Sequence, residues 1–210
     1  MSLSQNEHPW GTGIPDINDI EKICWQMLHE GATNRKSAMH QAIIGTSVDS
    51  IAHMRTVVLR RVDTDTRKIY LHTDKRSKKM QDLEQTKHLS WLVYDQSLRT
   101  QIRCSGAIII HHMDDLCKEQ WDHTGHHSRR YYMTDQPPST ELDQTSTGLN
   151  EALTAFDYTQ EESEAGFQHF VVVETCIDWM EWYYTHSKGN RRARFTYDKN
   201  KLSGSSWLMP

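Results

Sequence analysis

The spacing of apolar residues near the start of the chain predicts a helix over roughly 16–30. One face of it carries residues at the 3.6-residue helical spacing: Ile17, Ile20, Cys24, Met27 and Leu28. Asp16 can accept hydrogen bonds from the first free amides, and Gly31 can end the helix in a left-handed turn. We therefore expect an amphipathic helix that covers a hydrophobic core.

From residue 38 onward the period changes to two, which is typical of strands. Runs rich in β-branched residues predict strands at 38–46, 54–62, 68–74, 88–95, 99–112 and 167–185, with 191–198 as the last strand. Short connections at 62–68 and 96–98 suggest hairpins. Short helices are predicted at 77–85 and 113–123, and the polar stretch 123–148 is predicted to be mostly loop.

Strands that outnumber helices and follow one another through short turns favour a mainly β fold. We expect an antiparallel sheet closed into a small β-barrel with flanking helices, because closure removes exposed strand edges. A parallel doubly wound sheet would need a helix after nearly every strand, which this chain does not provide. The chain is interpreted as one domain over 1–210, with a helical extension at 1–35 and an irregular insertion at 123–165.

Composition narrows the class of protein. With 210 residues, 36% hydrophobic and 25% charged, the chain is globular and suits one domain. No stretch approaches the roughly 20 apolar residues of a membrane helix, and the first residues lack a signal-peptide pattern. The net charge of -4 gives no basic field for nucleic acid, and four cysteines without a CxxC indicate neither a zinc ribbon nor a disulfide framework. These features predict a cytoplasmic protein without membrane or nucleic-acid partners.

Residues that could bind a phosphate group lie between positions 55 and 79. Arg55 lies on a predicted strand, and Ser77, Lys78 and Lys79 open a short helix after the next strand. A helix N-terminus offers free amides and partial positive charge, which cations and a hydroxyl strengthen. Together these groups could hold a dianionic phosphate. The alternative is ordinary solvated surface, since arginine and lysine are common at the ends of strands and helices.

The order of several short motifs is informative. They are RTVVLR at 55–60, LHTDKRSKK at 71–79, RTQIRCSG at 99–106, RARFTY at 192–197 and WLMP at 207–210. In this order and spacing they resemble the pyridoxamine 5'-phosphate oxidase family and its relatives, the FMN-binding split barrels. The resemblance implies a six-stranded antiparallel split barrel that binds FMN, a small-molecule substrate, and a homodimer with the flavin at the subunit interface.

The resemblance also implies roles for particular residues. Arg55 and Lys79 would hold the FMN phosphate, helped by Ser77 and Lys78. The residues that would border the isoalloxazine ring are Thr56, Val57, Val58, His72 and Thr73. Three further contacts to the flavin would come from later in the chain: Gln101, Arg194, and either Trp182 or Tyr184.

The substrate side departs from the family. Arg60 stands where the oxidases carry a substrate-contacting lysine, and Asn190 and Arg192 replace the arginine and histidine of their R-x-H motif. Arg60 and Arg192 are therefore the candidate catalytic residues. The family's tyrosine, arginine and serine from the middle of the chain have no clear counterparts. The nearest are Trp121, Ser128 and Arg129.

Three functions remain open from the sequence. The first is an FMN-dependent oxidoreductase of the oxidase type, in which the cofactor supplies the redox chemistry. The second is a non-catalytic flavin carrier or stress-related sensor, and the third is a haem-binding barrel. The histidines crowded between 111 and 127 match no metal-ligand template, so no metal site is predicted, although they could face the flavin pocket. The aromatic run 177–184 is interpreted as core or interface.

Overall fold

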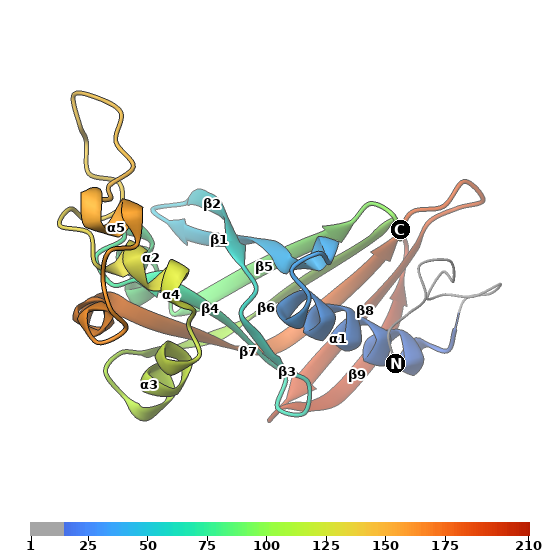
Figure 1. Cartoon of the computed structure of the whole chain (residues 1–210). Helices are drawn as coiled ribbons and strands as arrows, with labels where there is room; N and C mark the ends of the chain where they lie inside the picture. The colour runs from blue at the N-terminus through green and yellow to red at the C-terminus, as the bar shows by residue number, and fades with distance from the viewer. Residues whose placement is uncertain (1–14) are drawn as a thin grey trace.

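The computed structural model describes residues 15–210, in which nine strands form one antiparallel sheet (Figure 1). The fold is mainly β with flanking helices, as predicted. The strands are β1 (Gln41–Val48), β2 (Ile51–Val58), β3 (Arg61–Asp63), β4 (Lys68–Asp74), β5 (His88–Asp95), β6 (Thr100–His111), β7 (Phe170–Tyr184), β8 (Arg191–Asp198) and β9 (Lys201–Leu208). Pairing runs in the order β2-β1-β5-β6-β7-β4-β3, and β8 and β9 branch from β7.

The sheet of residues 15–210 is not closed by strand pairing, and it has nine strands in place of the expected six. The reason lies in β7, which is 15 residues long and exchanges one neighbour halfway along. Its first half pairs with β4 and its second half with β8, while β6 follows it along both halves. The register of β6 on β7 shifts at Gly106, where a Cβ would lie 1.8 Å from the carbonyl oxygen of Cys176. The sheet therefore divides at β7 into one part with β4 and β3 and another with β8 and β9, instead of forming a continuous barrel.

The helices lie at the two ends of this sheet (Figure 1). They are α1 (Ile17–Thr33), α2 (Lys78–Thr86), α3 (Asp115–Asp122), α4 (His126–Arg129) and α5 (Glu151–Ala155), with 3-10 helices η1 (Ala38–His40), η2 (Arg130–Tyr132) and η3 (Glu162–His169). The α2, α3, α4 and α5 helices gather at one end, and α1 lies toward the other, near β8 and β9. No helix in the described part of the chain is both long and apolar enough to span a bilayer.

The predicted N-terminal helix is confirmed, and it covers the core. Asp16 caps it by accepting a hydrogen bond from the amide of Asn18 at 2.8 Å. The helix continues past Gly31 to Thr33, so the predicted stop at Gly31 is wrong. Gly31 serves close packing instead, because a Cβ there would lie 2.7 Å from Met39. Residues 1–14 of the expected N-terminal extension, including the region assessed for a signal peptide, lie outside the described residues.

Two differences from the predicted strands have clear physical causes. The run 54–62 is two strands, because β2 pairs with β1 whereas β3 pairs with β4 across the predicted 62–68 hairpin. The 96–98 hairpin between β5 and β6 is confirmed. The strand β9 was missed, and β8 is not the last strand. Nearly every residue of β9 is exposed, so it has no alternation of apolar and polar positions to reveal it.

Candidate functional site

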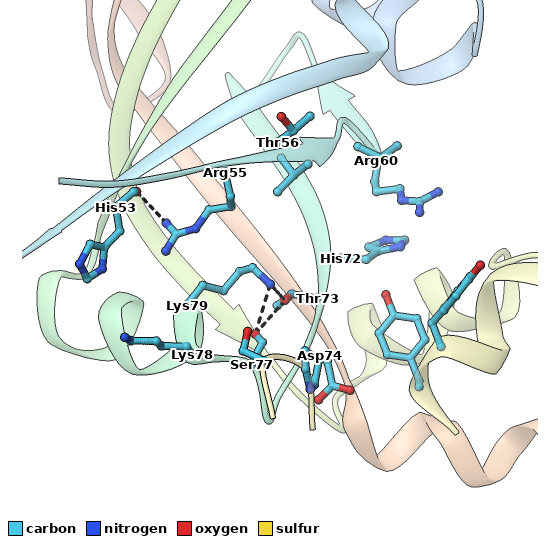
Figure 2. Close-up of a pocket in the computed structure, with 16 residues that line it drawn as sticks. His53, Arg55, Thr56, Arg60, His72, Thr73, Asp74, Ser77, Lys78 and Lys79 are labelled. Carbon is cyan, nitrogen blue, oxygen red and sulfur yellow. Dashed lines mark hydrogen bonds between the residues drawn. The ribbon is translucent and has the colours of Figure 1, made fainter. Parts of the chain in front are cut away.

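A cavity of about 650 Å³ opens between β2, β4, α2 and the segment 131–139 (Figure 2). It is lined by ten residues that the sequence predicted for a cofactor or substrate: Arg55, Thr56, Val57, Val58, Arg60, His72, Thr73, Ser77, Lys78 and Lys79. It is also lined by six that were not predicted: His53, Asp74, Tyr131, Tyr132, Pro138 and Ser139. Side chains far apart in the sequence thus share one pocket.

Arg55 is held rigidly at one end of the cavity. Its Nη1 donates to the hydroxyl of Thr46 at 2.7 Å and to the carbonyl oxygen of His53 at 3.0 Å, and its Nη2 donates to Asp82 Oδ2 at 2.9 Å. Burial alone would raise the pKa of Asp82, but hydrogen bonds from His53, Thr46 and Arg55 hold it below its usual range. Asp82 is therefore an ionised carboxylate, and it fixes the direction of the guanidinium.

Lys79 approaches the same end of the cavity from α2. Its Nζ donates to the hydroxyls of Thr73 at 2.8 Å and Ser77 at 3.3 Å (Figure 2), and no carboxylate of residues 15–210 forms an ion pair with it. Burial, with a smaller effect of Arg55, lowers the pKa of Lys79. Ser77 is the N-cap of α2, but its side chain makes no capping hydrogen bond. The Met80 amide donates to the Ser77 carbonyl oxygen at 2.9 Å, and among residues 15–210 no partner is found for the amides of Lys78 and Lys79, which could therefore bind a ligand. This donor set fits a dianionic phosphate.

The middle of the cavity is less polar. Val57 and Val58 on β2 are half-buried there, and His72 on β4 lies edge-on to Phe170 with 4.7 Å between ring centroids. Burial, and then the charge of Arg60, lowers the pKa of His72 to about 3. The imidazole is therefore neutral. A flat, mostly apolar ring next to a bound phosphate fits this wall.

Arg60 lies at the far end, beyond Thr56 (Figure 2). Among residues 15–210, no hydrogen-bond or ion-pair partner is found for its guanidinium, and burial lowers its pKa. Tyr132 lies close enough for the two groups to affect each other's pKa, and burial raises that of the Tyr132 hydroxyl, which therefore stays protonated. This end offers an unneutralised cation and a hydroxyl to an anionic ligand.

The insertion at 123–165 lines the cavity with Tyr131 and Tyr132. The nearest counterparts of the family's substrate residues do not line it. Trp121 and Arg129 are fully buried, with the Arg129 guanidinium 4.4 Å from the ring centroid of Trp121. The same guanidinium donates to the carbonyl oxygen of Trp121 at 2.8 Å. Neither these two side chains nor that of Ser128, the nearest counterparts of the family's middle residues, lines the cavity. Trp121 and Arg129 hold the insertion together.

Four residues predicted to contact the flavin or the substrate lie away from this cavity: Gln101, Trp182, Arg192 and Arg194. Gln101 and Arg192 line a second cavity of about 310 Å³, together with Arg103, Glu181, Tyr183 and Pro210. Glu181 is 2% exposed and accepts hydrogen bonds from three guanidiniums: Arg103 at 3.1 Å, Arg192 at 2.6 Å and Arg194 at 2.8 Å. Burial would raise the pKa of Glu181, but these bonds hold it below its usual range. The cluster therefore carries a net positive charge.

Trp182 lies on the opposite face of β7 from this cluster. It is 0% exposed in the hydrophobic core, and Tyr184 stacks on it at 5.9 Å. The aromatic side chain on the face of Gln101 is Tyr183, which pairs with Gln101 in the register of β6 and β7. Because Gln101 pairs with Tyr183 and side chains alternate along a strand, Trp182 belongs to the face opposite Gln101. Trp182 therefore lies in the core, away from the other residues predicted to contact the flavin.

The crowded histidines serve packing and local hydrogen bonds. His126 stacks on Tyr158 with ring centroids 4.2 Å apart, and His127 lies 4.3 Å from Phe156. His111 Nδ1 lies 2.8 Å from Asp114. Within residues 15–210, no three His, Cys, Asp or Glu side chains are grouped as metal ligands, and none of these histidines lines the large cavity.

Comparisons with known proteins agree with this geometry. Residues 22–112 match the family model of the pyridoxamine 5'-phosphate oxidase FMN-binding domain. A pyridoxamine 5'-phosphate oxidase-related, FMN-binding protein from Nostoc punctiforme aligns over 100% of both chains, with 18% identity and a TM-score of 0.70. PhzG from Burkholderia lata, solved in complex with tetrahydrophenazine-1-carboxylic acid, aligns over 93% of this chain and 94% of its own, with 20% identity and a TM-score of 0.67. No curated protein matches the sequence. At these identities the two structures show a shared fold.

Proposed function

We propose that the chain is an FMN-dependent oxidoreductase with an altered substrate site, because residues 22–112 match the family model of the pyridoxamine 5'-phosphate oxidase FMN-binding domain. The observation that carries the proposal is the 650 Å³ cavity, which gathers cations and hydroxyls at one end and, at the other, a guanidinium without a partner among residues 15–210. A cytoplasmic location stays a prediction from composition, which cell fractionation would check.

In this proposal the chain binds and orients the cofactor, and FMN supplies the two-electron redox chemistry when bound. Arg55, Lys79 and the α2 N-terminus hold the phosphate. Backbone and side chains of β2 and β4 lie against the ring, and His72 contributes a neutral imidazole beside it. Arg60, with the hydroxyl of Tyr132, would orient an anionic substrate over the ring.

We further propose that the working unit is a homodimer with FMN between the subunits. The predicted flavin contacts Gln101 and Arg194 lie outside the large cavity, so they would have to act on the cofactor of a second copy. The outer face of the sheet also has an apolar groove of about 550 Å³, lined in part by Ile43, Met54 and Trp179. A second copy would remove such a patch from water. Sedimentation should therefore give twice the monomer mass, and a monomeric holoprotein would contradict the dimer.

One observation favours a second candidate, a flavin carrier without a dedicated organic substrate. Two positions that would grip substrate in the oxidases are bonded within the chain. Arg192 donates to Glu181 at 2.6 Å, and Asn190 donates to the hydroxyl of Tyr183 at 2.8 Å. Neither residue lines the large cavity, so neither is placed to hold a substrate there. The two candidates share the cofactor and differ only in catalysis.

The first test is the identity of the cofactor and the second is turnover. The purified full-length protein should be yellow, and acid release should yield FMN and not FAD. A colourless protein that cannot be reconstituted with FMN would contradict both candidates. Pyridoxamine 5'-phosphate, other amines and quinones should then be assayed with peroxide release as a readout. Turnover supports the oxidoreductase, whereas tightly held FMN without turnover across the panel supports the carrier.

A further inference from the structure

An imidazole and a carboxylate meet at the phosphate end of the large cavity, and no prediction included either of them. His53 Nδ1 on β2 lies 3.1 Å from Asp82 Oδ2 on α2. Asp82 is 4% exposed, and the same oxygen accepts from Thr46 at 2.9 Å and from Arg55 at 2.9 Å. Since Asp82 is ionised, it can only accept, so Nδ1 of His53 must carry the proton of this hydrogen bond.

The other nitrogen of the same ring is available to a ligand. His53 lines the cavity, its side chain is 34% exposed, and no partner for Nε2 is found among residues 15–210. Figure 2 shows the side chain at the same end of the cavity as Arg55, Lys78 and Lys79. The charged groups around it are these three cations, with Asp82 behind the ring and Asp74 across the cavity.

The protonation state of His53 decides what it offers to a phosphate. With the proton of the neutral ring fixed on Nδ1 by Asp82, Nε2 presents a lone pair, which repels a phosphate oxygen. After the ring gains a second proton, Nε2 becomes a donor and forms a charge-assisted hydrogen bond. Binding of a dianion at this end therefore favours uptake of one proton by His53.

We propose that His53, oriented by Asp82, is a phosphate-binding residue of the FMN site and takes up a proton as FMN binds. This inference rests on the proposed FMN function and adds a pH dependence to it. Affinity for FMN should therefore fall as the pH rises, because Nε2 is a donor only when the ring carries both protons.

The test compares FMN dissociation constants of the full-length protein at about pH 6 and about pH 8.5, measured by flavin fluorescence. From the lower to the higher pH, we expect the wild-type protein to lose about tenfold more affinity than His53→Gln does. The phosphate of FMN titrates near pH 6 itself, but it does so equally with every variant. His111→Gln is the matched control, because His111 Nδ1 also lies beside a carboxylate, that of Asp114 at 2.8 Å, and His111 does not line this cavity. It should behave like wild type.

Two further measurements separate charge from shape. Riboflavin lacks the phosphate, so His53→Gln should not change its binding at either pH. His53→Lys keeps a cation at both values and should keep the affinity at about pH 8.5 within roughly threefold of that at pH 6. The same pH profile for wild type and His53→Gln, or an equal loss of riboflavin binding, would overturn the inference. If wild type binds no FMN at either pH, the proposed function itself fails.

Discussion

The two ends of the large cavity are built in opposite ways. At the Arg55 end two cations are fixed by the chain itself, since Arg55 is bonded to Asp82 and Lys79 to Thr73 and Ser77. At the other end, Arg60 has no such partner among residues 15–210, and its neighbour His72 is held neutral. We call the Arg55 end the prepared end, because its donors are held in place before a ligand binds. The Arg60 end is the unprepared end, because only a bound anion would neutralise its cation.

This difference has an energetic meaning. Fixed donors lose little conformational freedom when a ligand arrives, so the Arg55 end should supply most of the affinity for the cofactor. An unneutralised, half-buried guanidinium is costly until an anion meets it, so the Arg60 end should supply selectivity. The residues that the resemblance assigns to the phosphate thus lie at the prepared end, and Arg60, which departs from the family, lies at the unprepared one.

The largest expected effect is at the prepared end. Arg55→Ala removes the fixed guanidinium and leaves the Asp82 carboxylate facing the phosphate, so we expect FMN affinity to fall about 100-fold. Asn190→Ala is the comparison, because Asn190 lies outside the cavity and bonds to Tyr183. It should change FMN affinity less than about twofold. Titration of the apoprotein with FMN measures both, and equal losses would mean that the phosphate lies elsewhere.

The prepared end was also the part most visible in the sequence. Arg55, Ser77 and Lys79 lie within one stretch of 25 residues, so local pattern and motif order were enough to group them. Tyr132 enters from an insertion that has no regular pattern. His53 shows no signal before the structure places Asp82 beside it. These contacts depend on long-range packing, which spacing along the chain does not encode.

Long-range packing also explains three differences between the sheet and its prediction, which concern Trp182, the strand β9 and closure into a barrel. The aromatic run 177–184 was interpreted as core or interface, and Trp182 does lie in the core, although it was also predicted to contact the flavin. The missed strand β9 is exposed along nearly its whole length and exists because its backbone pairs with β8. Closure of the sheet could not be decided from apolar runs, because it depends on where β7 exchanges β4 for β8.

A smaller effect is expected at the unprepared end. Arg60→Gln should leave FMN affinity within about twofold and weaken binding of pyridoxamine 5'-phosphate, used as an anionic probe, by about tenfold. The matched control is Arg61→Gln on the neighbouring residue, whose guanidinium already pairs with Glu119 at 3.3 Å on the surface. Perturbation of the flavin spectrum of the holoprotein measures the probe. Equal effects of the two substitutions would show that Arg60 is not the anion-binding group.

The smallest effect concerns the loop that lines the cavity with Pro138 and Ser139. Arg76 Nη1 donates to the carbonyl oxygen of Thr134 at 2.7 Å, and its Nη2 pairs with Asp74 at 2.8 Å, so one guanidinium ties the loop containing Pro138 and Ser139 to β4. Arg76→Lys keeps a cation beside Asp74 but cannot span both partners. We expect FMN release and cleavage by a glutamate-specific protease after Glu141 to become roughly threefold faster, because the loop opens more often.

Arg191→Lys makes the same exchange at an exposed arginine that bonds only to the neighbouring carbonyls of Gly189 and Asn190, and it should leave both rates unchanged. Faster cleavage without faster FMN release would mean that the loop covers only the substrate end, which would sharpen the contrast between the two ends. Faster release without faster cleavage would contradict it, because Arg76 would then act on the phosphate end through Asp74 and α2 instead of through the loop.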